Sequence, residues 1–91
     1  MYDVVKIGEL VVKALKKGGL PLSIYENFYK TFCVLDREKD LSLFNVKPIG
    51  ENFHRMRKGK YRAIFHLEND NVYIDLIAKR DEVYKLWEQK Q

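Results

Sequence analysis

The residues best suited to chemistry are cations concentrated in one short stretch, residues 53–62, with the sequence FHRMRKGKYR. Five of these ten residues are arginine or lysine, and none is acidic. A guanidinium group is permanently charged, and its planar fork of donors matches the oxygens of a phosphate. The stretch therefore predicts a surface that binds phosphate groups.

The pattern of this stretch predicts two β-strands joined by a tight turn around its glycine. Apolar Met56 alternates with Arg55 and Arg57, and a glycine allows the chain to reverse. Because successive side chains of a strand point to opposite faces, Arg55 and Arg57 share one face while Met56 faces a core. The same alternation along the second strand predicts that Arg62 and His66 lie on the face of the two arginines.

The rest of the chain predicts the elements that carry this hairpin. Gly18 and Gly19 end a first helix, and Ser23 followed by Glu26 is typical of a capping box that starts a second helix. The expected elements are a strand over residues 2–7, helices over 9–17 and from 23 to about 35, a short extended piece over 41–46, strands on both sides of the basic turn and over 72–78, and a terminal helix over 81–89.

This order, β-α-α-β-β-β-α, predicts an α+β fold and one domain over residues 1–91. We expect a mainly antiparallel, four-stranded sheet with a helical hairpin on one face and a short C-terminal helix. An aromatic stripe on the second helix is typical of packing against the sheet, and a base-stacking platform is the alternative. The stripe consists of Tyr25, Phe28, Tyr29, Phe32 and Leu35.

Composition limits the class of protein. Ninety-one residues with 46% hydrophobic content suit one small domain, and a formal net charge of +4 favours a polyanionic partner. With a single cysteine, Cys33, the chain can form no internal disulfide, which suits a reducing cytoplasm, where we expect the protein. No apolar run is long enough to span a bilayer, and Cys33, His54 and His66 lack the spacing of zinc ligands. We therefore expect no membrane, metal or other cofactor.

Two segments together resemble a known family. The first is the basic stretch, and the second is AKRDEVY at residues 78–84, in which Arg80 precedes Val83 and Tyr84. Their types and spacing are similar to those of the RelE/ParE superfamily of toxins, and to its RelE-like branch in particular. The resemblance is detailed over residues 47–85, and before that it rests on the order of the elements.

The resemblance implies a toxin of a type II toxin–antitoxin system, held inactive by a cognate antitoxin protein. In the RelE-like branch the toxin enters the ribosome and cuts messenger RNA without metal. Matching positions imply catalytic roles for Arg55, Arg57, Arg62, Arg80 and Tyr84. We expect Arg62 and Arg80 to clamp the scissile phosphate. The residues expected to bind RNA around them are Lys58, Lys60, Lys79 and His66.

The general base is less well defined. Metal-free cleavage needs a base for the 2′-hydroxyl, an acid for the 5′-oxygen and positive charge for the phosphorane. Members of this branch often have lysine where this chain has Arg55 and Arg57, and arginine is a poor base because it does not release its proton. The alternatives are Tyr84, if arginines stabilise its phenolate, His66, and His54, which strand parity turns towards the core.

Three other interpretations fit the same residues. The ParE branch keeps the fold, lacks the nuclease residues and poisons DNA gyrase by binding it; the arginines at 55 and 57 keep this alternative open. Lys79 also stands where many relatives have histidine. A member that only binds an antitoxin is the second alternative. The third is that the cations merely keep a sheet edge soluble. The other matching residues favour the nuclease.

Overall fold

Five strands and three helices are present among the residues that the computed structural model describes, namely 5–38, 45–69 and 71–90. In chain order they are β1 (Val5–Ile7), α1 (Glu9–Lys17), α2 (Leu22–Glu38), β2 (Val46–Ile49), β3 (Phe53–Lys58), β4 (Tyr61–Glu68), β5 (Asn71–Lys79) and α3 (Arg80–Lys90). None of the described helices is both long and apolar enough to cross a membrane.

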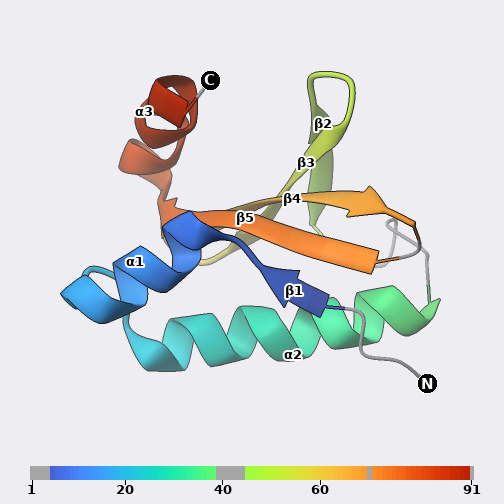
Figure 1. Ribbon diagram of the computed structural model, residues 1–91, viewed down its shortest axis with the longest axis horizontal. Coiled ribbons are helices and arrows are strands. Elements are labelled where there is room, and N and C mark those ends of the chain that lie inside the picture. Colours follow the sequence, from blue (N-terminus) through green and yellow to red (C-terminus); the bar gives the residue numbers. More distant parts are fainter. Residues whose placement is uncertain (1–4, 39–44, 70, 91) are drawn as a thin grey trace.

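The strands form one sheet in the order β1-β5-β4-β3-β2. The pairs from β5 to β2 are antiparallel, and β1 runs parallel to β5. Helix α2 lies along one face with α1 beside it, and α3 stands on the opposite face (Figure 1). The predicted α+β class is confirmed, together with a mainly antiparallel sheet.

The strand count is five instead of the expected four, because β2 continues through Lys47 and Pro48 to Ile49. The proline and glycine of the sequence KPIG at 47–50 are typical of a break in regular structure. Proline is tolerated here because β2 is an edge strand, so its missing N–H removes no bond to a further neighbour. Pro48 pairs in register with His54 of β3. The extended piece expected over residues 41–46 lies mostly outside the described residues.

The helix ends agree only in part with the capping signals. Gly18 ends α1 with a φ of 78°, as predicted for a left-handed glycine cap. Helix α2, however, begins at Leu22, so Ser23 lies inside its first turn and the capping-box prediction is wrong. The amides of Ile24 and Tyr25 instead donate to the carbonyl of Pro21, each at 3.1 Å.

The main core lies between the sheet and the two N-terminal helices. Phe28 and Phe32 of α2 are fully buried, and Phe32 meets Phe65 of β4 edge-on, with ring centroids 4.8 Å apart. The interpretation of the aromatic stripe as a packing surface is confirmed for these two residues, whereas Tyr29 is exposed. Met56 is buried in the same core, as its strand parity predicted.

A second, smaller core lies on the other face, beneath α3. Val83 and Trp87 of α3 pack there with Ile64 of β4 and Leu76 of β5. The Trp87 ring meets Phe53 edge-on at 4.7 Å. The face opposite the two N-terminal helices is therefore covered where α3 crosses it, and only the remainder is available for a site.

A β-bulge in β5 adds a polar residue to this second face. Ile64 pairs with Leu76 while the next residue, Phe65, pairs with Ile74, so Asp75 is the extra residue. A bulge places two neighbouring residues opposite one. As a result Leu76 packs beneath α3 and Asp75 contacts His66 on the same face.

Candidate functional site

Four arginines, here called the arginine cluster, gather near the turn between β3 and β4. Arg57 and Arg62 are directly paired across these strands, and Arg55 lies two residues before Arg57 on the same face. Arg80 begins α3, and its amide donates to the carbonyl of Lys60 in the turn at 2.9 Å. One hairpin and one helix start thus hold all four predicted arginines.

Strand pairing confirms which face the arginines occupy. Arg57 and Arg62 stand in one row with Ala78, and Arg55 stands in a row with Ile64. Ala78 and Ile64 both belong to the core beneath α3, and cross-strand neighbours project to the same side. The cluster therefore lies on the α3 face, as the alternation of the sequence predicted.

Arg62 is more buried than its position in a basic hairpin suggested, with 6% of its surface exposed. Its Nη1 donates to the carbonyls of Gly59 and Tyr61, at 2.8 and 3.0 Å. Gly59 has a φ of 58°, which glycine adopts without strain. The side chain of Arg62 is thereby tied to the turn that also receives the amide of Arg80.

The cluster carries positive charge that its surroundings do not balance. Burial lowers the pKa of Arg62, and the charges of Arg55, Arg57 and Arg80 lower it further. Among the described residues, no carboxylate forms an ion pair with Arg55, Arg57 or Arg62. Arg80 lies 3.7 Å from Asp81, with both side chains largely exposed. An anion bound here relieves this repulsion.

Two guanidinium nitrogens also indicate that the cluster binds an anion. The Nε atoms of Arg55 and Arg62 are buried and have no hydrogen-bond partner among the described residues. A buried donor without a partner is unfavourable, and such groups are uncommon in folded proteins. An anionic ligand with several oxygens can accept hydrogen bonds from such donors.

Tyr84 places a phenol beside the cluster. It lies one turn into α3, with 41% of its surface exposed, and its hydroxyl accepts a long hydrogen bond of 3.4 Å from Nη1 of Arg55. The structure thus brings together all five residues that the resemblance marked as catalytic. A phenolic hydroxyl both donates and accepts hydrogen bonds, and such a group placed beside a reacting atom can transfer a proton.

The predicted lysines are placed differently. Pairing across three strands aligns Lys58 with Tyr61 and Tyr61 with Lys79. Tyr61 packs against the core on the α2 side, so the row faces away from the arginine cluster. Lys60 lies in the turn itself and lines a small cavity with Lys79 and Arg80. The lysines therefore surround the turn instead of extending the arginine face.

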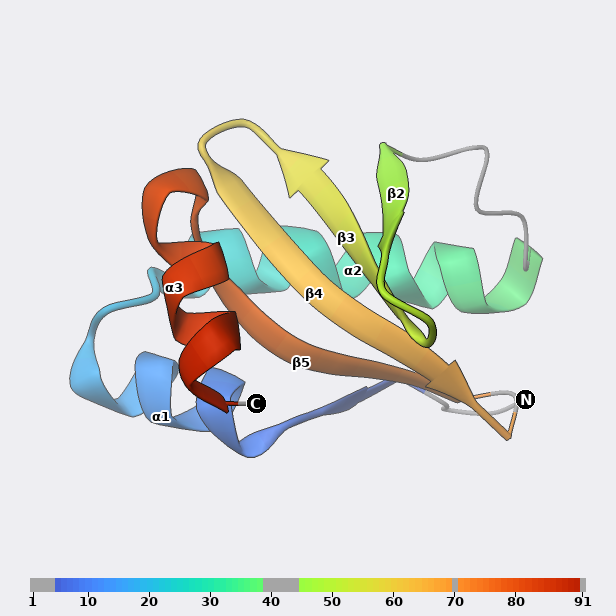
Figure 2. The ribbon, with the colours of Figure 1, turned by 90° about the horizontal axis from the view of Figure 1, so that it is seen from above.

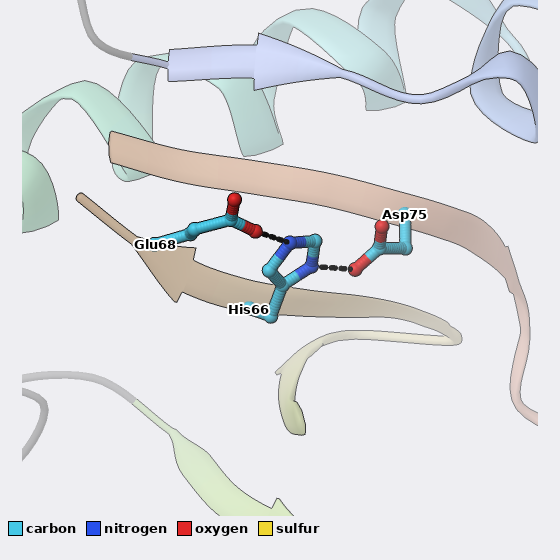
Figure 3. A network of polar contacts seen from close by, with 3 residues as sticks. All are labelled: His66, Glu68 and Asp75. Atoms are coloured by element: carbon cyan, nitrogen blue, oxygen red, sulfur yellow. Dashed lines mark hydrogen bonds and ion pairs between the residues drawn. The ribbon is translucent and has the colours of Figure 1, made fainter. Parts of the chain in front are cut away.

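The two histidines have structural partners. His66 lies on the arginine face, but its Nδ1 is 2.6 Å from Oδ2 of buried Asp75 and its Nε2 is 3.4 Å from Glu68 (Figure 3). Its ring also stacks on Tyr73 at 4.9 Å. His54 faces the main core, where its ring stacks on Phe65 at 5.4 Å. Neither arrangement leaves the imidazole directed at the cluster.

We expect His66→Ala to lower the free energy of unfolding by about 2–4 kcal/mol, because it leaves the buried Asp75 carboxylate without its partner. Urea denaturation followed by circular dichroism measures the change. Glu68→Ala is the matched control; this carboxylate is 58% exposed, so its loss costs about 1 kcal/mol or less. Equal, small effects of the two substitutions would contradict the structural role of the His66–Asp75 pair.

A groove of about 970 Å³ continues from the cluster around the turn to α2. Arg57, Arg62 and Arg80 line it, and so do Asn27 of α2 and Asn45, which directly precedes β2. Neither asparagine is among the site residues predicted from the sequence. Nothing in the local pattern marks them, because they are far apart in the chain and come to line one groove only through the packing of α2 beneath the hairpin.

Potential metal ligands do not gather in the structure. Within residues 5–38, 45–69 and 71–90, no group of three or more histidine, cysteine or acidic residues is arranged to hold a metal ion. The polar groups around the turn are instead donors suited to an anion.

Comparison with solved structures identifies the fold. Over 88% of its length this chain matches 97% of a chain of the archaeal RelE–RelB complex from Pyrococcus horikoshii OT3, with 30% identity and a TM-score of 0.64. It also matches 98% of a chain of the RelB–RelE antitoxin–toxin complex from Methanococcus jannaschii, over 90% of its own length, with 21% identity and a TM-score of 0.69. No protein-family model and no curated protein sequence matches the chain.

The fold is thus that of a toxin of a type II toxin–antitoxin system. The extent of the match to the Pyrococcus complex, together with its identity, defines the family. This chain belongs to the RelE/ParE toxin superfamily, as a RelE-like member.

Proposed function

We propose that this RelE-like toxin cuts messenger RNA on the ribosome, without a metal ion, and so inhibits translation. The observation that carries the proposal is the arginine cluster with the Tyr84 hydroxyl beside it. A purely DNA-gyrase-binding relative has no need for a phenol held among guanidinium groups, whereas cleavage of an RNA linkage does.

The reaction we propose is attack of a ribose 2′-oxygen on the adjacent phosphorus, with loss of the 5′-oxygen. It leaves a 2′,3′-cyclic phosphate on one fragment and a 5′-hydroxyl on the other. The phosphorane between these states carries extra negative charge on oxygen. Preorganised donors directed at such charge are among the largest contributions to catalysis.

The four arginines take different roles in this proposal. Arg80, whose side chain is 70% exposed, reaches the non-bridging oxygens of the phosphate. Arg62 presents its remaining donors from a fixed position, because its Nη1 is occupied by the Gly59 and Tyr61 carbonyls. Arg55 orients the Tyr84 hydroxyl. Arg57, which is exposed and paired with Arg62, adds charge at the entrance.

Tyr84 is the proposed proton-transfer group. Its oxygen, held by Arg55, receives the proton of the 2′-hydroxyl as the bond to phosphorus forms, and its own phenolic proton passes to the departing 5′-oxygen. We expect Tyr84→Phe to lower the rate of cleavage by about 10²–10⁴-fold, the usual range for a general acid or base, with little change in stability because the ring is retained. Single-turnover cleavage on programmed ribosomes measures this rate, and a Tyr84→Phe variant as fast as wild type would contradict the role.

The experiment that tests the function is cell-free translation with purified protein, in the magnesium that ribosomes need and with a chelator selective for transition metals. A nuclease produces new 5′ ends within the coding sequence, mapped by primer extension. A gyrase poison produces trapped DNA breaks and intact messenger RNA instead. An inactive member produces neither.

We also propose an antitoxin partner for this chain. The solved relatives were crystallised as RelE–RelB complexes. The arginine cluster and the exposed lysines around the turn match an acidic segment, so an antitoxin bound there neutralises the charge that the RNA needs. Co-expression with the neighbouring reading frame, followed by purification, tests whether a complex forms.

A further inference from the structure

The groove beyond the arginine cluster contains groups that charge neutralisation does not require. Part of its lining is formed by Asn27 and Asn45, whose side chains are amides, together with Lys58 and Tyr61. An amide both donates and accepts hydrogen bonds, so it distinguishes the edges of different bases, whereas a lysine binds any phosphate. We propose that this part of the groove binds a base next to the cut and that Asn27 and Asn45 determine which base is preferred.

Separate elements bring the two asparagines to the same groove. Asn27 is exposed in the first half of α2, and Asn45 directly precedes β2, with its carbonyl accepting the amide of Arg57 at 3.0 Å. That bond fixes Asn45 beside a member of the arginine cluster. The β3–β4 turn and the first half of α2 lie at the same end of the molecule (Figure 2). A strand of RNA leaving the cluster therefore has a direct path to both asparagines.

The lining favours a single-stranded nucleic acid over other ligands. Among the described residues that line the groove, five are cations and none is acidic. Half-buried Tyr61 offers an aromatic ring between the lysines, and single-stranded nucleic acids bind where a basic groove carries such rings. The volume of about 970 Å³ lies in the range of ligand-sized clefts, about 300–1,000 Å³. An acidic protein segment satisfies the cations but makes no use of the ring.

This inference rests on the proposed function, since it names what the same nuclease reads. Its first test nevertheless uses no ribosome and no cleavage. Short homopolymers of 2′-O-methyl RNA, which lack the attacking hydroxyl, are labelled and titrated with purified protein, and binding is followed by fluorescence anisotropy. Poly-A, poly-C, poly-G and poly-U are compared at the same salt concentration.

We expect wild type to prefer one homopolymer by about fivefold or more, the discrimination expected when amides read a base edge. Asn27→Ala and Asn45→Ala reduce that preference and leave binding of the weaker homopolymers unchanged. Lys58→Ala weakens all of them by a similar factor and lowers the dependence on salt. Asn52→Ala is the matched control, because Asn52 is equally exposed but lies in the turn between β2 and β3, away from the groove.

Equal binding of all homopolymers, or an Asn27→Ala variant with the preference of wild type, overturns the inference. Binding of polyglutamate without binding of any RNA also overturns it and assigns the groove to an acidic protein partner.

Mapping of cleavage positions separates this inference from the proposed function. If wild type and Asn27→Ala cut messenger RNA at the same positions, the base-binding inference is wrong and the proposed function stands. If the protein never cuts messenger RNA, but Asn27→Ala removes its base preference in binding, the proposed function is wrong and the groove is still an RNA-binding site.

Discussion

Arg80→Ala is expected to abolish growth arrest and to lower cleavage of messenger RNA by about 10²–10³-fold, the loss seen when one preorganised donor is removed from developing charge. The thermal unfolding midpoint should remain within a few degrees of wild type, because the Arg80 side chain is exposed and its structural bond to Lys60 is made by the backbone amide. Induction in cells and single-turnover cleavage measure the two effects.

Lys85→Ala is the matched control for this prediction. Lys85 is an exposed cation of the same helix, and it does not belong to the arginine cluster. Full toxicity of Arg80→Ala would rule out the nuclease assignment, whereas equal losses in both variants would indicate a general effect of net charge.

Arg62→Ala should be as inactive as Arg80→Ala but also less stable, since it removes two hydrogen bonds to the carbonyls of the turn.

Phe28→Ala is expected to have the largest effect on stability. The side chain is fully buried between α2 and the sheet, and removal of such a ring costs about 3–5 kcal/mol through lost burial and the cavity left behind. Domains of this size are stable by about 5–15 kcal/mol, so a large part of the margin disappears. Urea denaturation monitored by circular dichroism measures the loss.

Tyr29→Ala provides the comparison on the adjacent position of the same helix. Tyr29 is 37% exposed, and we expect its replacement to cost about 1 kcal/mol or less. A Phe28→Ala variant within about 1 kcal/mol of wild type would show that α2 does not anchor the main core. If such a stable Phe28→Ala variant were nevertheless not toxic, the loss would have to arise from a change in the groove that Phe28 also lines.

The basic hairpin shows why some features of the site are predictable. Alternation in a strand has a period of two, so Arg55 and Arg57 share a face and Met56 takes the other in any sheet that this segment joins. A glycine between two extended segments indicates the turn, and Gly59 has the positive φ that such a turn requires. These properties depend only on residues that are close in the chain.

Other features depend on residues that the chain separates widely. Pro48 suggested a break, yet an edge position makes a strand possible, and no local pattern reveals which strand is at the edge. The bulge at Asp75 shifts the register of one strand by a residue and turns a carboxylate towards His66. The resulting polar contact gives His66 a structural partner where the sequence suggested contact with RNA.

The amino-acid sequence by itself determined the α+β class, the basic hairpin and the common face of its arginines, because backbone geometry converts short spacings into direction. The tertiary structure alone decided that Arg62 is buried, that α3 brings Arg80 and Tyr84 to the same turn, and that Asn27 and Asn45 line one groove. Each of these depends on how α2 and α3 pack on the two faces of the sheet. Packing is a property of the whole folded chain, and no short segment carries it.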